Sequence, residues 1–344
     1  MAMVTDATLS MIKDEVAKRN EYWRNFALLY TNATWDTIQA NVRSGRGAEM
    51  YPVGTELVCN YTYNGETYSF PWIIVENNRT FTTEGGMVSP GLVLQAKYAT
   101  IETLPFDAAE REEATEETAQ EGFYYCGYKS PSYRMLNLEP GDPIPYESYT
   151  RIYKGSINNY NVYSYGYNRW SMSAVRQWLN SDGDVGEWWT ASHPGDSAPS
   201  QLETYAGFMR GLDDDFLAVV QPVHIKTVCN NVVDGGVTED TTDKFWLASV
   251  EEMYGVPQPN VVGIEGDYFT YWKETMGVSN PTNSTNNARK VRALESPAST
   301  TAYNVYTRSC SLSYTQTNWF NKAGQMTTGN ASQAMRVHPV CVIC

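Results

Sequence analysis

The C-terminal stretch, residues 303–344, constrains the fold more than any other part of the chain. It passes from a polar segment rich in Tyr, Ser, Thr and Asn (303–321) to a closing run, Met-Arg-Val-His-Pro-Val-Cys-Val-Ile, at 335–343. The closing run alternates apolar and polar residues and then becomes almost wholly apolar, which predicts a strand entering a core. The polar segment before it offers adaptable contacts on a rigid base. This contrast predicts a buried tail that carries an exposed, interacting segment.

The composition predicts a folded, acidic protein. Hydrophobic residues make up 42% and charged residues 19% of 344 residues, which fits one large globular domain or a domain with an accessory segment. The 25 Tyr and 10 Trp favour amphipathic contact surfaces as well as a core. A formal net charge of −14 opposes binding to nucleic acids or to anionic membranes.

Cysteine, acidic and terminal patterns exclude further classes. The six cysteines are irregularly spaced, and the CxxC that begins at Cys341 has no second pair, so we expect free thiols and no zinc site. The run Asp213-Asp214-Asp215 lacks the ligand spacing of a calcium loop, so cap and turn roles are expected. Residues 1–10 do not resemble a signal peptide, and the chain has no run of 18 apolar residues, so no membrane insertion is expected.

The N-terminal segment, residues 1–45, is expected to be helical. Apolar residues in 5–31 follow spacings of three and four, the pattern of three coiled-coil heptads. Its seam residues are Leu9, Ile12, Val16, Trp23, Phe26 and Tyr30. The segment is either an oligomerising stalk or docking helix, or an amphipathic helix packed on its own domain. Three heptads are marginal alone, so a bundle would need contacts from the domain behind it.

Residues 46–344 are expected to form one mixed domain. Asn64-Gly65 between alternating runs predicts a hairpin of strands 53–63 and 68–75. Helix 169–180, capped by Ser171 or Ser173, is predicted from its apolar face. The acidic stretch 107–121 is expected to be a solvated insertion. The remaining predicted elements are a helix at 34–42, strands at 91–98, 219–228 and 243–249, and a helix at 250–254.

Several segments together resemble a known family. They are Trp35-Asp36-Thr37-Ile38, Pro52-Val53-Gly54, the run from Ser173 to Asn180, the run from Asp243 to Glu252, Tyr306-Thr307-Arg308-Ser309, and the run from Arg336 to Val340. In this order they resemble an uncharacterised family of bacterial and prophage proteins similar to the C-type-lectin fold, which formylglycine-generating enzymes share. The resemblance covers residues 34–343. It implies an α+β, C-type-lectin-like domain with irregular loops and short helices, preceded by the N-terminal helix.

The C-terminus also resembles the variable proteins of diversity-generating retroelements, including phage tropism determinants. In those proteins loop residues vary while the buried last strand stays fixed, so the resemblance implies a ligand-binding segment at 303–336. Its matching positions are Tyr303, Asn304, Tyr306, Arg308, Ser311, Ser313, Tyr314, Gln316, Asn318, Trp319 and Asn321. Tyr and Trp bring contact area, and Ser and Asn bring hydrogen bonds. The alternative is an ordinary polar loop capping a sheet. This chain departs from the family pattern in having Met335 where a Gly is usual and in inserting His338.

The sequence gives no positive sign of catalysis. Its three histidines, His193, His224 and His338, accompany no nucleophile motif. Cys341 and Cys344 are three apart in a predicted strand, so they point to opposite faces and do not form a redox pair. We therefore expect no catalytic residue, no cofactor and no metal. Paired carboxylates for glycoside hydrolysis remain open because spacing along the chain does not give spacing in space.

Together these observations favour a non-catalytic binding protein of phage or prophage origin. We expect a homo-oligomer, with a trimer favoured, held through residues 5–31 and presenting residues 303–336 to a cell-surface protein or glycan receptor. It would be made in a bacterial cytoplasm and associate with the virion. One alternative is a structural virion or assembly protein with no outside ligand. A weaker alternative is a carbohydrate-active or modifying enzyme.

Overall fold

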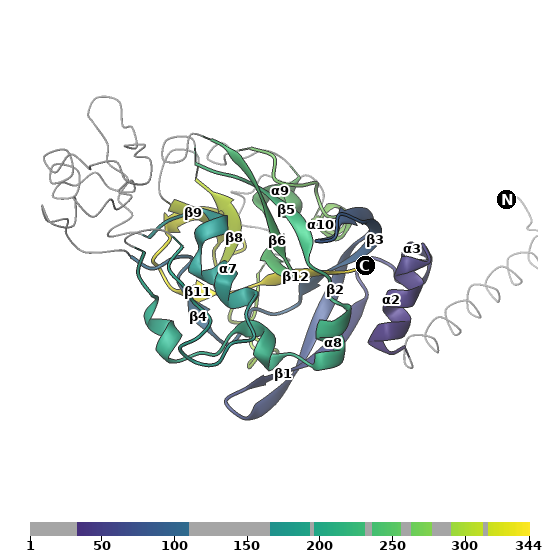
Figure 1. Ribbon diagram of the computed structural model, residues 1–344, viewed down its shortest axis with the longest axis horizontal. Coiled ribbons are helices and arrows are strands. Elements are labelled where there is room, and N and C mark those ends of the chain that lie inside the picture. The colour runs from purple at the N-terminus through teal and green to yellow at the C-terminus, as the bar shows by residue number, and fades with distance from the viewer. Residues whose placement is uncertain are drawn as a thin grey trace, which may run out of the picture.

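The computed structural model describes residues 33–109, 166–192, 196–230, 236–255, 263–276, 290–311 and 316–344 (Figure 1). The predicted helix at 5–31 and the acidic residues from 110 onward lie outside these ranges. Short helices and several sheets confirm the predicted α+β class. The helices are α2 (Trp35–Arg43), α3 (Gly47–Met50), α7 (Ala174–Leu179), α8 (Asp214–Val219), α9 (Val250–Tyr254) and α10 (Thr270–Met276), with 3₁₀ turns at Trp170–Met172, Ser200–Glu203 and Phe208–Gly211.

The first sheet has five antiparallel strands in the order β1-β2-β3-β12-β7. Its strands are β1 (Glu56–Tyr63), β2 (Glu66–Thr82), β3 (Val88–Ala96), β12 (Pro339–Ile343) and β7 (Phe245–Leu247). The turn between β1 and β2 has positive φ at both central residues, 50° at Asn64 and 79° at Gly65. Asn and Gly tolerate this conformation, so the predicted hairpin is confirmed.

The last strand, β12, lies inside this sheet and not at its edge. Val340 pairs with Gln95 of β3 on one side and with Trp246 of β7 on the other. All five of its residues are buried. A strand with neighbours on both sides and cover on both faces is expected to be continuously apolar, as the closing run is. The prediction of a buried C-terminal strand is therefore confirmed.

A second five-stranded sheet has the order β10-β9-β8-β11-β4. Its strands are β4 (Thr103–Leu104), β8 (Val305–Cys310), β9 (Gln316–Phe320), β10 (Met326–Asn330) and β11 (Met335–Arg336). The pairs are antiparallel except β8 with β11, which is parallel. The strands β5 (Val223–Val228) and β6 (Thr238–Asp243) form a separate antiparallel pair.

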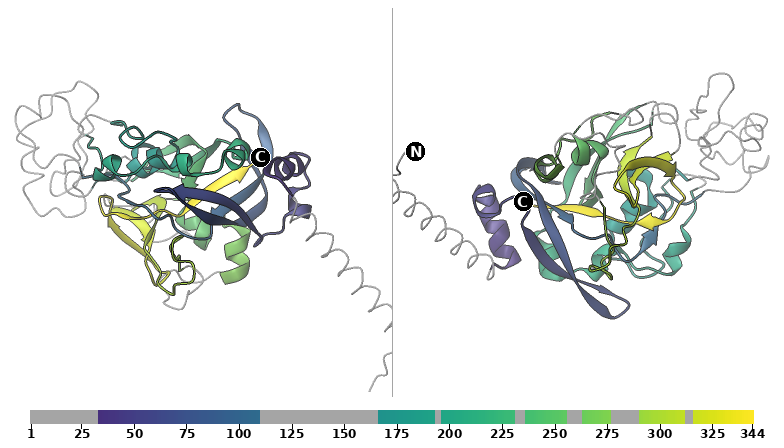
Figure 2. Two further views of the ribbon diagram at one scale, coloured as in Figure 1. Left: turned by 90° about the horizontal axis from the view of Figure 1, so that it is seen from below. Right: turned by 180° about the vertical axis from the view of Figure 1, so that it is seen from behind.

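The main core lies between the first sheet and the segments that carry α7 and α8. Figure 2 (left) shows these teal segments on one side of the sheet and α10 on the other. Trp72 of β2 contacts Phe216 of α8 and Phe245 of β7, with ring centroids 5.4 and 6.0 Å apart. Phe208 joins the same cluster at 5.2 Å from Phe245. Aromatic rings at such distances contribute area burial and favourable ring geometry to the core.

Helix α2 closes the end of the molecule beside the chain's last residue (Figure 1). Its N-cap is Thr34, whose hydroxyl accepts from the backbone N–H of Thr37. The Trp35 ring lies 4.7 Å from that of Phe216. Gln39 and Arg43 donate to the backbone oxygen of Cys344 at 3.2 Å each. The predicted helix at 34–42 is confirmed, and it fastens the C-terminus.

Two predicted elements differ from the structure. The helix predicted at 169–180 is a 3₁₀ turn followed by α7, because Ser173 is extended (ψ 143°) and its hydroxyl caps α7 by accepting from Arg176 N–H. The strand predicted at 219–228 begins only at Val223, because Val219 ends α8. Pro222, directly before β5, has no N–H to donate to a ladder. In the part of the chain that the structure describes, no helix is long and apolar enough to cross a membrane.

Candidate functional site

The predicted binding positions divide into buried and half-buried groups. Tyr306, Arg308, Ser311 and Asn318 are at most 2% exposed. The half-buried positions are Tyr303, Asn304, Gln316, Trp319 and Asn321. Ser313 and Tyr314 lie outside the described residues. The structure therefore brings only part of the predicted segment to the surface.

The buried group corrects the predicted site. All six residues of β8 are buried because the strand lies between β9 and β11 and is covered on both faces. The Tyr306 hydroxyl donates to the carbonyls of Ala331 and Gln333, and burial raises the pKa of this phenol. The Asn318 amide donates to the carbonyls of Ser309 and Cys310 at 3.2 and 2.9 Å. These side chains hold the interior together and do not belong to a contact surface.

Arg308 is the most consequential member of the buried group. Its guanidinium donates to the Glu252 carboxylate at 2.5 Å, to the Leu247 carbonyl at 2.9 Å and to the Glu265 carbonyl at 2.5 Å. Glu252 also accepts from the backbone N–H of Ser249, whose hydroxyl accepts from Glu252 N–H, forming a capping box on α9. Arg308 thus joins β8, β7 and α9. A buried charge pair of this kind positions elements, whatever its net contribution to stability.

The half-buried group lies on adjoining parts of the second sheet. Asn304 accepts from the backbone N–H of Lys322 at 3.0 Å, which joins the start of β8 to the β9–β10 turn. Asn321 shapes that turn, because its Oδ1 accepts from the N–H groups of Ala323 and Gln325 at 2.9 and 3.1 Å. These contacts fix the backbone beneath the half-buried side chains. The loop is thus a rigid support for contact residues.

Trp319 is the largest side chain of the half-buried group. In the β9 register it faces Tyr306 of β8 and Thr327 of β10. Its indole Nε1 has no hydrogen-bond partner among the described residues. Trp319 lies on β9, an inner strand between β10 and β8, and its Nε1 is buried, so only the exposed part of its ring is open to a ligand contact.

Two residues that the sequence did not single out lie beside the half-buried group. Lys322, exposed beside Asn304, and Thr327, opposite Trp319, belong to the same region. The register of the β9–β10 hairpin places these two residues there. The sequence has no clear turn signal from which this register could be predicted. We call Tyr303, Asn304, Trp319, Asn321, Lys322 and Thr327 the C-terminal surface.

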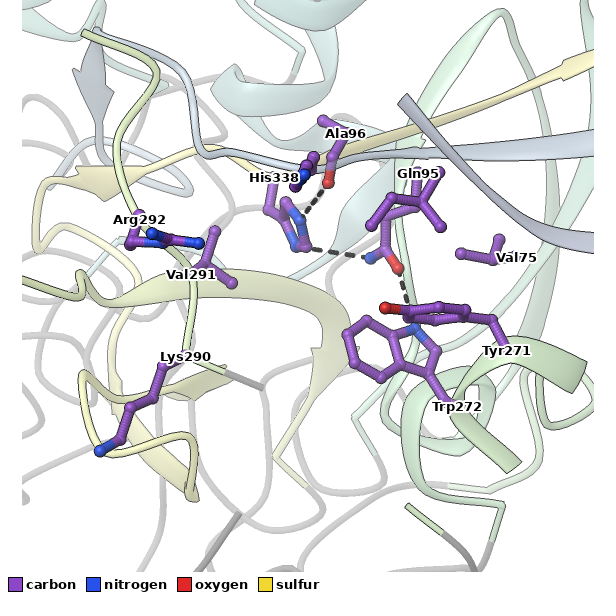
Figure 3. A pocket seen from close by; sticks show the side chains of 11 residues that line it. Val75, Gln95, Ala96, Tyr271, Trp272, Lys290, Val291, Arg292 and His338 are labelled. Atoms are coloured by element: carbon purple, nitrogen blue, oxygen red, sulfur yellow. Dashed lines mark hydrogen bonds between the residues drawn. The ribbon is translucent and has the colours of Figure 1, made fainter. Parts of the chain in front are cut away.

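A pocket of about 160 Å³ lies elsewhere, where β3, α10 and the residues before β12 meet (Figure 3). His338 Nε2 contacts the Ala96 carbonyl at 2.6 Å and must donate there, so its Nδ1 accepts from the Gln95 amide at 3.4 Å. The Gln95 oxygen accepts from the Trp272 indole at 2.9 Å. Burial lowers the pKa of His338 to about 4. Both ring nitrogens take part in hydrogen bonds, and this neutral histidine is a buried core residue.

The cationic side chains around this pocket are directed to other partners. The Lys97 ammonium contacts Glu56 at 2.5 Å, and Arg292 donates to the Pro297 carbonyl at 2.8 Å. The Lys290 side chain points away from the His338–Gln95–Trp272 chain (Figure 3).

The other residues considered for chemistry are two histidines, the cysteines and the run of three aspartates. His224 is exposed on β5, and His193 lies outside the described residues. Five cysteines are free and buried, and Cys126 lies outside the described residues. The described residues contain no group of three or more His, Cys, Asp or Glu side chains able to hold a metal ion. Asp213 instead accepts from the backbone N–H of Asn60 at 2.7 Å and fastens α8 to β1.

Asp107, the first residue of the predicted acidic insertion, is buried and not solvated. Its two carboxylate oxygens accept from the backbone N–H groups of Tyr167 and Ala174 at 3.1 and 3.3 Å. These donors replace water around the carboxylate. Asp107 therefore belongs to the core domain.

Comparison with known proteins gives one informative match. Neither a search of curated proteins nor a search of solved structures finds a match to this chain. A model for a domain of unknown function, DUF6273, matches residues 147–344. This range includes α7, α9, the strands β7 and β12 of the first sheet and the C-terminal surface. Since the match covers more than half of the chain, the protein belongs to the DUF6273 family.

Proposed function

We propose that this chain is a non-catalytic binding protein of phage or prophage origin that presents the C-terminal surface to a cell-surface protein or glycan. The observation that carries the proposal is the division within residues 303–344. The closing strand β12 is wholly buried between β3 and β7, while the hairpin before it holds Trp319 and several amide side chains half-buried. Changes of side chain on the β9–β10 hairpin would therefore leave the buried strand β12 unchanged.

The arrangement of the ends of the molecule supports a receptor-reading role. Helix α2 lies at one end of the long axis and β9 toward the other, and the three views agree on this (Figures 1 and 2). A coiled coil at residues 5–31, directly before α2, would join copies away from the C-terminal surface. Several identical surfaces on one oligomer would raise avidity for a repetitive cell surface.

The finer fold is part of the same proposal. We propose a C-type-lectin-like domain, supported by a last strand inside the main sheet and by a second sheet built mostly from the strands that precede it in the chain. The buried Arg308, in the Tyr-Thr-Arg-Ser motif, would then be a structural signature that links β8 to α9. Fold alone does not give function, so the proposed activity depends on the surface.

Binding by labelled full-length protein to a glycan array and to intact bacterial cells tests the proposal. Replacing Trp319 with Ala should weaken binding by about 1 to 4 kcal/mol if it is an anchor residue. The matched control is Trp189→Ala, because Trp189 is also half-buried and lies away from the C-terminal surface. If both variants lose the same binding free energy, the weaker binding of Trp319→Ala comes from general destabilisation of the protein. In the neighbouring DNA, an adenine-biased template copy of codons 303–336 beside a reverse transcriptase would support the comparison with variable proteins.

One observation favours the assembly alternative. Strand β10 is at the edge of the second sheet, and an edge strand offers unpaired backbone groups to another chain. The assembly alternative predicts that Thr328→Pro disrupts oligomers of this chain. It also predicts that the wild-type protein binds neither cells nor glycans. Pro removes a backbone donor from the edge and blocks strand pairing.

A further inference from the structure

A second pocket, unrelated to the C-terminal surface, lies between the end of β1 and the segment 204–211, next to the long hairpin at the lower edge of Figure 1. Its volume is about 300 Å³, enough for a small organic molecule. Tyr61, Tyr63, Glu102, Tyr205 and Arg210 are among its lining residues. The proposed binding function uses none of them.

Glu102 has an incomplete set of partners inside this pocket. The residue is 2% exposed. Its Oε1 accepts from the Tyr61 hydroxyl, and its Oε2 has no hydrogen-bond partner among the described residues. A buried carboxyl oxygen without a donor is costly, and such groups mark sites where a ligand completes the structure.

The cations near Glu102 are bound to other groups. Arg336 donates to the carbonyls of Thr100 and Ile101 at 2.7 and 3.0 Å and forms an ion pair with Glu295 at 2.5 Å. Arg210 forms an ion pair with Asp184 at 2.8 Å. Glu102 therefore has no ion-pair partner among the described residues, and burial raises the pKa of its carboxyl to about 7. The missing element is a positive charge with an N–H donor.

The pocket holds the carboxyl in a fixed place. The Tyr61 ring lies 5.7 Å from Phe70 and 5.5 Å from Phe208, so its hydroxyl cannot follow Glu102 elsewhere. A Cβ at Gly211 would collide with the Tyr61 ring, so the absence of a side chain there lets the opposite wall approach closely. A fixed carboxyl lowers the entropic cost of binding.

Two further tyrosines complete the wall. Tyr63 and Tyr205 meet edge-on with ring centroids 6.3 Å apart. Tyrosine rings attract cations through their faces, and this attraction increases when water is displaced. The pocket thus combines one buried carboxyl with an aromatic pair.

We propose that this pocket binds a compact organic ammonium ion, whose N–H donates to Glu102 Oε2 while its carbon chain packs against Tyr63 and Tyr205. A neutral sugar would supply the missing donor but not the missing charge. The ligand class is therefore an alkylamine, such as a lysine-like side chain or a small amine.

The test compares n-butylamine with 1-butanol, which has the same length and no charge, by calorimetry with the full chain at pH 8. Butylamine should bind, and 1-butanol should bind at least tenfold more weakly. Glu102→Gln keeps the size and the acceptor for Tyr61 and should reduce butylamine affinity at least tenfold. Glu84→Gln, which removes an exposed carboxylate elsewhere, is the matched control and should leave affinity unchanged.

The pH dependence gives an independent readout. The titratable groups that line the pocket with Glu102 are Tyr61 and Tyr63 of β1 and Tyr205 and Arg210 of the opposite wall, and Arg336 of β11 and Glu295 act on its charge. An alkylamine stays charged below a pKa of about 10.4, so between pH 6 and 8 the ligand keeps its charge while the Glu102 carboxyl titrates. Since only the ionised carboxylate pairs with the amine, affinity should fall about tenfold from pH 8 to pH 6.

Clear outcomes would overturn the proposal. Butylamine binding that is absent, equal to that of 1-butanol or of methyl α-glucoside, or unchanged in Glu102→Gln would each contradict an ammonium site. Circular dichroism should show that Glu102→Gln is folded. If it is not, Tyr205→Leu provides the second variant and should weaken butylamine binding through loss of the aromatic wall.

Discussion

At the scale of single residues, His338 couples the stability of this fold to pH. Burial lowers the pKa of His338 to about 4, against 6.5 in an unfolded chain. Between these values the unfolded chain binds a proton and the folded chain does not. The contribution of the neutral His338 to the free energy of unfolding is thus complete above pH 6.5 and is lost as pH falls toward 4. The loss is about 3 kcal/mol, since one pKa unit corresponds to about 1.4 kcal/mol.

The variant His338→Asn isolates this effect. An Asn oxygen can accept from Gln95 as the imidazole Nδ1 does, but it does not titrate. Denaturant unfolding at a series of pH values should show the stability gap between the wild type and the variant narrowing by about 3 kcal/mol from pH 7 to pH 4. His224→Asn, at an exposed position, should run parallel to the wild type. A constant gap for His338→Asn would contradict a neutral buried imidazole.

The sequence assigned no catalytic role to His338, and it placed Arg308 and Asn318 in a ligand-binding segment. Alternation along a strand indicates exposure only when one face meets water. In β8 both faces are covered, and the partners of Arg308 come from Leu247, Glu252 and Glu265, which are distant in the chain. No local pattern could show that a charged side chain would find three partners there. Trp319 lies in β9 and Asn321 begins the β9–β10 turn, and both side chains are half-buried, so their role in binding stays a prediction.

At the scale of elements, β12 is the anchor of the main sheet. Val342 is fully buried and pairs with Val93 of β3. Replacing Val342 with Asp would bury a charge without a partner, so the chain should fail to fold, with a loss of at least about 4 kcal/mol. Val88→Asp is the matched control, because Val88 belongs to β3 but is 68% exposed. Thermal unfolding followed by circular dichroism should separate the two variants, and similar melting temperatures would contradict the central role of β12.

Elements with local signals were predicted well from the sequence. Asn64-Gly65 fixed the first hairpin, and Ser173 fixed the start of α7. The order of strands was beyond such signals. β12 pairs with β7, which lies almost a hundred residues earlier, and β11 and β4 have two residues each, too few to give any periodicity. Long-range pairing depends on which apolar faces fit together, and this is settled only in the assembled core.

At the scale of the whole molecule, the first described helix, α2, is hydrogen-bonded to the last residue of the described chain. Gln39 and Arg43 of α2 donate to the backbone oxygen of Cys344, so α2 is fixed to the residue that follows β12 of the main sheet. A force or an oligomer contact applied before α2 would act directly on the main sheet. The hairpin surface lies toward the other end of the long axis (Figure 1). This polarity explains how association and recognition could be separated in one chain.

The heptad pattern before α2 gives the last prediction. Removing residues 1–31 should lower the oligomeric state, because the seam residues supply the apolar contact between copies. Light scattering should show the smaller mass, while circular dichroism keeps its β signal. A sharper version compares Ile12→Lys with Asp14→Lys. Ile12 occupies the seam and Asp14 faces outward in the same heptad frame. Lys at the seam should dissociate the oligomer, and Lys at the outer position should not. If both variants keep the wild-type mass, residues 5–31 pack on their own domain, and copies of the chain must associate through another surface or not at all.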